Sequence, residues 1–176
     1  MTCHPGPIQV LPQYRDSLMS HTMIFVPSYF DYVRLRNYFK KHDLDFMSIC
    51  EYSSDKHISR SRTQFFHGKT HFFSVHREAS LLQTTAFGMS SVSRRFRLRG
   101  VHHVIFYELP LYGSFYADVC NMLTDRRRPT ADHFTCTVLY SHYDAHRLAG
   151  VVGSDRASHM ISTQKRVHMF VTGKDT

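Results

Sequence analysis

A chain of 176 residues with a hydrophobic fraction of 42% is long enough for one domain with a sizeable core and too apolar to be wholly disordered. Its formal net charge of +8 and its pI of about 9.5 favour a polyanionic partner, although a soluble basic surface alone also accounts for them. No apolar run approaches the roughly 18 residues of a membrane span, and the first residues hold no apolar signal core, so we expect neither membrane insertion nor secretion.

The start of the chain predicts a lead-in followed by a strand and a helix. Residues 1–20 contain three prolines and indicate an extended linker ahead of one domain over residues 21–176. The apolar run Met23–Val26 predicts a buried strand, which Pro27 ends. Ser28 then caps a helix with one apolar face. Because ligands meet parallel sheets at the carboxyl ends of the strands, Ser28 and its helix N-terminus are candidate phosphate contacts.

Strands alternating with helices follow, which is typical of a three-layer α/β domain with a mostly parallel sheet. We expect about six strands, at residues 23–26, 46–50, 70–75, 101–107, 134–140 and 167–171. Further helices are expected at residues 54–67, 114–123, 141–153 and 154–163. Ser114 is the expected cap of the second of these helices, and a capping box of Ser141 and Asp144 opens the third.

Motifs for nucleotide hydrolysis and metal binding are absent from the sequence. It contains no G-x-x-x-x-G-K-[ST], G-x-G-x-x-G or G-x-S-x-G pattern. Cys50, Cys120 and Cys136 lie in apolar surroundings without C-x-x-C spacing, which indicates small buried thiols in a reducing compartment. His142 and His146 could share a helix face, but no further ligand has matching spacing. We therefore expect no metal, no cofactor and no catalytic residue.

Arginine is the strongest chemical signal. Arg94, Arg95, Arg97 and Arg99 surround two apolar residues just before the strand expected at residues 101–107. In an extended chain the last three point outward together, a spacing suited to phosphates along a nucleic-acid backbone. The alternatives are a solvated edge, or arginines that pair with acidic groups elsewhere.

A second basic run consists of Arg126, Arg127 and Arg128 in a polar loop. Together with Ser28 and the arginines of residues 94–99, these are the residues that we expect to contact nucleic acid. Arg60 and Arg62 form a third basic site that could equally be the solvated face of a helix.

Three segments carry a resemblance to a known family: HTMIFVPSYFDYVRLRNYFKK, RRFRLRGVHHVIFYELPLYGSFYADVCNML and TCTVLYSHYDAHRLAGVVG. The chain, from about Val10 to Phe170, closely resembles the C-terminal region of the digestive organ expansion factor family. These are nucleolar proteins associated with the U3 small nucleolar RNA and the small-subunit processome, and they are similar to DEAD-box helicases with degenerate motifs. The resemblance implies the second RecA-like lobe of such a protein, located in the nucleus and nucleolus.

The resemblance also implies partners and an activity. Active helicases supply arginines from a helix after a strand to stabilise the transferring phosphate, but residues 115–123, FYADVCNML, contain none. We therefore expect a non-catalytic scaffold for precursor ribosomal RNA or U3 small nucleolar RNA and for processome proteins, active in ribosomal RNA processing. The alternatives are the second lobe of an RNA-dependent ATPase and a pure protein-interaction module.

Residues 79–92 depart from the pattern of that family. The stretch ASLLQTTAFGMSSV is uncharged and separates the strand at residues 70–75 from the arginine-rich segment. We interpret it as an insertion, either a surface helix or a disordered loop, or as the product of an alternative transcript.

Overall fold

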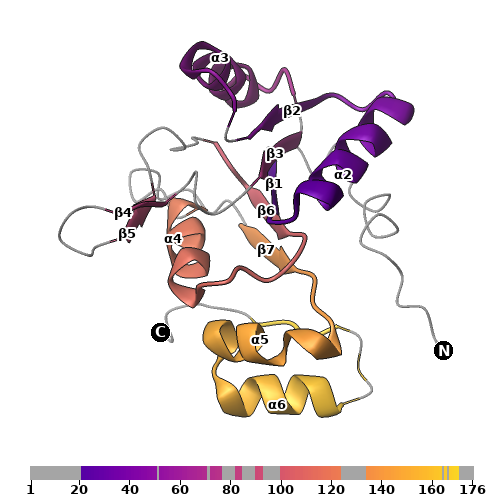
Figure 1. Cartoon of the computed structure of the whole chain (residues 1–176), viewed down its shortest axis with the longest axis vertical. Helices are drawn as coiled ribbons and strands as arrows, with labels where there is room; N and C mark the ends of the chain where they lie inside the picture. Colours follow the sequence, from indigo (N-terminus) through magenta and orange to yellow (C-terminus); the bar gives the residue numbers. More distant parts are fainter. Residues whose placement is uncertain are drawn as a thin grey trace.

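A computed structural model of the chain describes residues 21–50, 52–70, 72–76, 82–84, 90–92, 100–123, 134–163, 165 and 167–170. Within them, five strands form one sheet in the order β2-β3-β1-β6-β7, and every pairing in it is parallel (Figure 1). The strands are β1 (Thr22–Val26), β2 (Phe46–Ile49), β3 (Phe72–His76), β6 (His103–Phe106) and β7 (Thr135–Val138). The predicted α/β fold with a parallel sheet is therefore confirmed.

The sheet has five described strands where the sequence predicted about six. The sixth was expected at residues 167–171, but residues 167–170 form no strand. Val167 and Met169 are exposed, and Phe170 lies against Arg156, whose guanidinium carbon is 5.8 Å from the ring centroid. A strand needs a neighbour for its backbone hydrogen bonds, and an apolar run alone does not provide one.

The helices begin close to where their caps predict. Ser28 and Ser54 cap α2 (Tyr29–Lys41) and α3 (Asp55–Phe66), and each accepts a hydrogen bond from the backbone N–H three residues later. Gly68 follows α3 with a φ of 68°, which a glycine adopts at no steric cost. The helix α4 (Gly113–Leu123) starts one residue before Ser114, so that serine is not its cap. Among the described residues, no helix is both long and apolar enough to cross a membrane.

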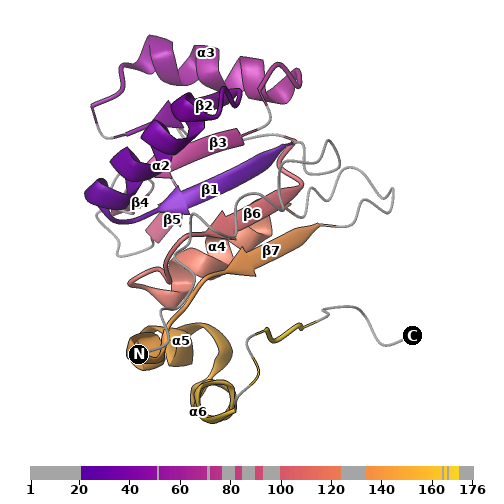
Figure 2. The ribbon, with the colours of Figure 1, turned by 90° about the vertical axis from the view of Figure 1, so that its right-hand side faces the viewer.

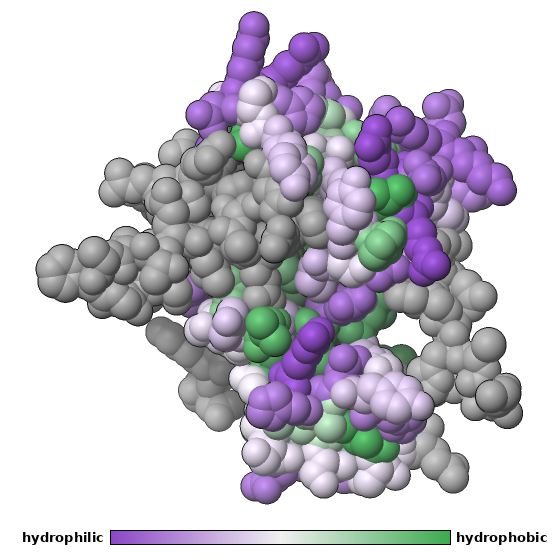
Figure 3. All heavy atoms as spheres, in the orientation of Figure 1, coloured by the Kyte–Doolittle hydropathy of each residue, from purple (hydrophilic) through white to green (hydrophobic). Residues whose placement is uncertain are grey.

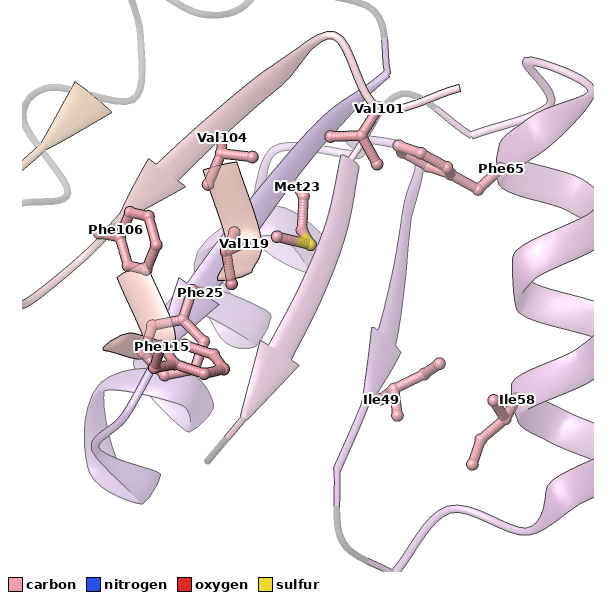
Figure 4. Close-up of a cluster of buried hydrophobic side chains, with 10 residues drawn as sticks. All are labelled: Met23, Phe25, Ile49, Ile58, Phe65, Val101, Val104, Phe106, Phe115 and Val119. Carbon is pink, nitrogen blue, oxygen red and sulfur yellow. The ribbon is translucent and has the colours of Figure 1, made fainter. Parts of the chain in front are cut away.

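Helices cover both faces of the sheet. On one face, α2 packs its apolar side over β1 and β6, and Leu35 and Phe39 are completely buried there. On the other face, α3 and α4 pack over the opposite side chains of the same strands (Figure 4). Because successive side chains of a strand point to opposite faces, a continuous apolar run such as β1 serves both layers.

A cluster of aromatic rings fixes α4 on the sheet. Phe25 of β1, Phe106 of β6 and Phe115 of α4 are fully buried (Figure 4). The ring of Phe25 lies 4.9 Å from that of Phe115 and 5.5 Å from that of Phe106, measured between centroids. Burial of each such side chain contributes roughly 1.5–3 kcal/mol to folding. This cluster therefore sets the position of the chain that leaves β6.

A pair of helices closes the β7 side of the domain. The capping box of Ser141 and Asp144 is confirmed and opens a short 3-10 turn, η5 (His142–Asp144). The helices α5 (Ala145–Val152) and α6 (Ser154–Ser162) follow, with Gly153 between them at a φ of 89°. Figure 2 shows both below β7. Their small core contains Leu109, which brings the chain after β6 against α5.

The uncharged stretch at residues 79–92 contains strands and not the surface helix that was one of our expectations. Its described residues form β4 (Leu82–Thr84) and β5 (Ser90–Val92), which pair antiparallel to each other as a separate two-stranded sheet. β5 contacts α4 (Figure 1). The two strands satisfy the hydrogen bonds of their backbone N–H and C=O groups by pairing with each other. The composition of the segment does not reveal this pairing.

Candidate nucleic-acid interface

The five parallel strands all end at one edge of the sheet, which we call the C-terminal edge. The arrowheads of β1, β6 and β7 point to the same side in Figure 2. The described connections at this edge follow β1, β2, β6 and β7. Loops at the carboxyl ends of parallel strands are the usual place for a ligand in such folds, so the C-terminal edge is the first place to look for a site.

Ser28 lies at the C-terminal edge, between β1 and α2, as predicted. Its side-chain oxygen accepts a hydrogen bond from the backbone N–H of Asp31 at 3.4 Å, and its carbonyl accepts one from the N–H of Tyr32 at 2.9 Å. Ser28 therefore already has a structural role as the cap of α2. A hydroxyl that accepts one hydrogen bond keeps its own proton to donate, so a phosphate contact is chemically compatible with that role.

Acidic groups surround this helix start. Asp31 in the first turn of α2 and Glu108, two residues after β6, interact with each other. Burial, and next the charge of Asp31, raise the pKa of the Glu108 carboxyl above its usual value. Burial, and next the same Asp31 charge, raise the pKa of the Tyr107 hydroxyl to about 12. The immediate surroundings of Ser28 are therefore less favourable for an anion than a helix N-terminus alone.

Two arginines flank the acidic pair and offset its charge. Arg34 lies 3.4 Å from Asp31 across one turn of α2, and 71% of the Arg34 side chain is exposed. Arg147 of α5 lies 4.0 Å from Glu108 and also donates a hydrogen bond to the carbonyl of Leu109 at 3.5 Å. Partly exposed pairs of this kind are worth less than about 1 kcal/mol each. Arg34 thus remains accessible to a phosphate that approaches α2.

Exposed aromatic and apolar side chains follow the ends of four strands. Phe30 after β1 is 78% exposed, Tyr52 after β2 is 82% exposed, and Tyr143 after β7 is 99% exposed. We call the full set the aromatic rim; its members are Tyr29, Phe30, Tyr52, Leu111, Tyr112 and Tyr143. Large apolar side chains that repeat around one edge are typical of a docking or base-stacking surface.

The rim was not predicted as a site, although the sequence contains a signal for part of it. The aromatic share of 14% is high, and aromatic residues follow both Pro27 and Pro110 within three residues. Such residues can equally enter the core, as Phe115 does. Only the strand order shows that the loops after β1, β2, β6 and β7 share one edge.

The predicted arginines lie outside the described residues. This holds for Arg94, Arg95, Arg97 and Arg99 and for the second run, Arg126, Arg127 and Arg128. The described residues that follow the two segments, Gly100 and Phe134, lie at the other edge of the sheet, where β6 and β7 begin. There the N–H of His102 donates to the carbonyl of His21 at 3.1 Å, and the N–H of Thr135 donates to the carbonyl of His102 at 3.2 Å.

The structure therefore does not place Ser28 beside the points where the arginine segments join the sheet. Ser28 follows β1 at the C-terminal edge, whereas Gly100 and Phe134 precede β6 and β7 at the opposite edge. In Figure 3 hydrophilic side chains also gather over α3 and over the end of α2 that is remote from Ser28. Among the described residues, no three His, Cys, Asp or Glu side chains lie close enough to hold a metal ion.

Comparison with known proteins places the chain in a family. The family described as "Utp25, C-terminal domain" matches residues 8–170. The U3 small nucleolar RNA-associated protein 25 homolog of Xenopus tropicalis is 51% identical over 167 residues, which cover 95% of this chain and 20% of that protein. The U3 small nucleolar RNA-associated protein 25 of Schizosaccharomyces japonicus is 35% identical and is covered to 24% of its length. The chain thus spans between a fifth and a quarter of these relatives.

A solved structure shares the fold at low sequence identity. The C-terminal domain of the DEAD-box protein Dbp5 superposes with a TM-score of 0.61, with 12% identity, over 82% of this chain and 76% of that one. At such identity the likeness concerns the fold alone. The architecture described above is accordingly similar to that of the C-terminal domain of this DEAD-box protein.

Proposed function

We propose that this chain, which belongs to the Utp25 C-terminal domain family, is a non-catalytic lobe that binds RNA and proteins during assembly of the small ribosomal subunit. The observation that carries the proposal is its identity of 51% to a U3 small nucleolar RNA-associated protein over almost its whole length. Its partners would be precursor ribosomal RNA or U3 small nucleolar RNA, together with processome proteins in the nucleolus. The relatives are four to five times longer, so the matching region is one part of each of those proteins.

In this proposal one set of residues binds RNA and another set binds proteins. The arginines of residues 94–99 and 126–128 hold RNA phosphates, and Ser28 contributes a further phosphate contact. The aromatic rim docks onto assembly factors, because exposed aromatic side chains bury much area at little cost in conformational entropy. The net charge of +8 favours the RNA contacts. The mechanism is docking, and no bond in the RNA is made or broken.

A lack of catalysis is part of the same proposal. The helix that follows β6, α4, has the sequence GSFYADVCNML and contains no arginine to stabilise a transferring phosphate. The chain also lacks a glycine-rich phosphate loop. We expect the full-length protein to hydrolyse no ATP in the presence of RNA. ATP turnover that a mutation in this lobe abolishes would instead favour the RNA-dependent ATPase.

The phosphate contacts are tested by reversing charges. Replacement of Arg95, Arg97 and Arg99 by glutamate is expected to weaken binding to structured ribosomal RNA. It is also expected to flatten the salt dependence, because each lost phosphate contact lowers the slope of log K against log salt by about 0.7 to 0.9. The measurement is a titration of RNA binding at several salt concentrations.

A matched variant separates specific contacts from net charge. Replacement of Lys40, Lys41 and Lys69, which are exposed, by glutamate changes the charge by the same amount. We expect this control to keep the slope of the unmodified chain. An unchanged slope in the arginine variant contradicts the proposed phosphate contacts, and an equal loss in both variants shows that overall charge alone attracts RNA. Absence of RNA crosslinks in cells would favour the pure protein-interaction module.

A further inference from the structure

Cys120 and Cys136, which are 16 residues apart in the sequence, come together between α4 and β7. Cys120 belongs to the second half of α4, and Cys136 is the second residue of β7. Their Sγ atoms are 3.7 Å apart, with the Cys120 thiol donating a hydrogen bond to the Cys136 sulfur. Both side chains are half-buried. Neither belongs to the aromatic rim or to the proposed phosphate contacts.

The backbone around this pair is held in place. Cys136 pairs with Val104 in the register of β6 and β7, and its side chain packs against the core cluster under α4. Val119, next to Cys120 on α4, is completely buried in the same cluster. A disulfide has an S–S length of about 2.05 Å, so closure needs a movement of less than about 1 Å by each sulfur.

The surroundings make one of the two thiols the better nucleophile. A hydrogen bond that the Cys136 thiol donates to the ionised Cys120 lowers the pKa of Cys120, and the Tyr116 hydroxyl one turn earlier acts in the same direction. Burial opposes both effects. The hydrogen bond with Cys120, and next burial, raise the pKa of Cys136. Cys120 therefore ionises first and is the attacking sulfur, with Cys136 beside it as the resolving thiol.

We propose that Cys120 and Cys136 form an oxidation site that hydrogen peroxide converts into an intramolecular disulfide between α4 and β7. The Cys120 thiolate attacks one peroxide oxygen, the O–O bond breaks, and the departing hydroxide takes a proton to become water. The Cys136 sulfur attacks the sulfenic acid formed on Cys120, the S–S bond forms and the S–O bond breaks. The second hydroxide takes the Cys136 proton, so two thiols are oxidised and one peroxide is reduced to two waters.

The disulfide would tie together the two ends of the segment that contains Arg126, Arg127 and Arg128. Closure of a loop removes freedom from the unfolded chain, so the oxidised domain is expected to melt at a higher temperature than the reduced domain. Excess low-molecular-weight thiol reverses the bond by exchange. The proposal stands on the geometry of the two sulfurs and is independent of the proposed function.

The first test counts thiols in the full chain after treatment of the folded protein with hydrogen peroxide. Four cysteines are present. We expect the titration under denaturing conditions to fall from four thiols to two, and peptide mass spectrometry to find Cys120 linked to Cys136. The matched control Cys50→Ser is expected to fall from three thiols to one. Retention of all four thiols in the unmodified chain, or a bond to Cys3 or Cys50 instead, overturns the proposal.

The second test needs no cysteine variant, so its result does not depend on whether such variants fold. The unmodified chain is equilibrated with mixtures of reduced and oxidised glutathione, once in native buffer and once in concentrated urea. We expect the folded chain to be half-oxidised in a mixture at least about tenfold more reducing than the unfolded chain requires, because the fold holds the two sulfurs together. An equal or less reducing midpoint in the folded chain overturns the proposal.

Discussion

At the scale of single residues, Ser28 combines a structural role with a proposed functional one. Its hydroxyl caps α2, and its position after β1 is the place where a phosphate would meet the helix N-terminus. The nearby Asp31 and Glu108 carboxylates oppose an anion, whereas Arg34 favours one. The geometry of Ser28 is compatible with both the capping role and the phosphate contact. A comparison with Ser54, which caps α3, can separate the two roles.

We predict that Ser28→Ala lowers both stability and RNA affinity, whereas Ser54→Ala lowers stability alone. Ser54 caps α3 in the same way, so loss of either cap is expected to cost about 1 kcal/mol of unfolding free energy. Loss of a hydrogen bond to a charged phosphate would add about a tenfold weakening of RNA binding for Ser28→Ala. Denaturant titration and RNA titration of both variants measure the two effects. Equal RNA affinities in the two variants would assign Ser28 to the cap alone.

At the scale of elements, the contact of α4 with α5 depends on a missing side chain. A Cβ atom placed on Gly113, the first residue of α4, would lie 2.2 Å from the carbonyl oxygen of Gly150 in α5. That oxygen belongs to the backbone of a helix, so it cannot move aside without displacing α5. Among the described residues, and apart from the backbone of α5 itself, no atom lies within 4 Å of a Cβ added to Gly150. A side chain is therefore excluded at Gly113 and has space at Gly150, although both glycines lie where α4 approaches α5.

Gly113→Ala is accordingly expected to destabilise the domain by about 1–3 kcal/mol, because α4 and α5 must separate. Gly150→Ala is expected to stabilise it by about 0.4–1 kcal/mol, since alanine loses less backbone entropy in a helix interior. Denaturant titrations of the two variants provide the comparison. If Gly113→Ala folds as stably as the unmodified chain, the described approach of α4 to α5 is wrong.

At the scale of the whole molecule, strand order creates a surface that no single segment contains. The aromatic rim takes its members from residues that follow β1, β2, β6 and β7, and the parallel sheet brings these connections to one edge. The described residues that follow the arginine segments, Gly100 and Phe134, precede β6 and β7 at the other edge. A lobe whose aromatic rim contacts proteins and whose arginine segments contact RNA could hold both partners at once. This arrangement predicts that the two kinds of binding can be lost independently.

Replacement of Phe30, Tyr52 and Tyr143 by alanine is expected to reduce incorporation of the full-length protein into pre-ribosomal particles and to leave its RNA affinity unchanged. These side chains are largely exposed, so each change is expected to alter stability by no more than about 0.5 kcal/mol. The control replaces Val167, Met169 and Phe170, which are exposed outside the rim. Sedimentation of particles and RNA titration measure the two properties. Normal incorporation of the rim variant, or an equal loss in the control, would contradict the proposed role of the rim.

The sequence by itself determined the local elements and the family of this protein. The run at β1, the breaker Pro27 and the caps Ser28, Ser54 and Ser141 act through neighbours along the chain, so their effect can be recognised without a fold. The same kind of local signal overestimated the run at residues 167–170, which pairs with none of the described strands. The resemblance of the sequence to its family, which spans almost the whole chain, likewise needed no coordinates.

Only the tertiary structure decided which of these parts meet. The order β2-β3-β1-β6-β7 gathers the aromatic rim at one edge, and it sets Cys136 of β7 against Cys120 of α4 although their spacing indicated no redox pair. It also places Ser28 at the edge opposite to Gly100 and Phe134, the described residues that follow the two arginine segments. The physical reason is that apolar periodicity and caps are satisfied within a few residues, whereas proximity depends on strand pairing across the whole chain.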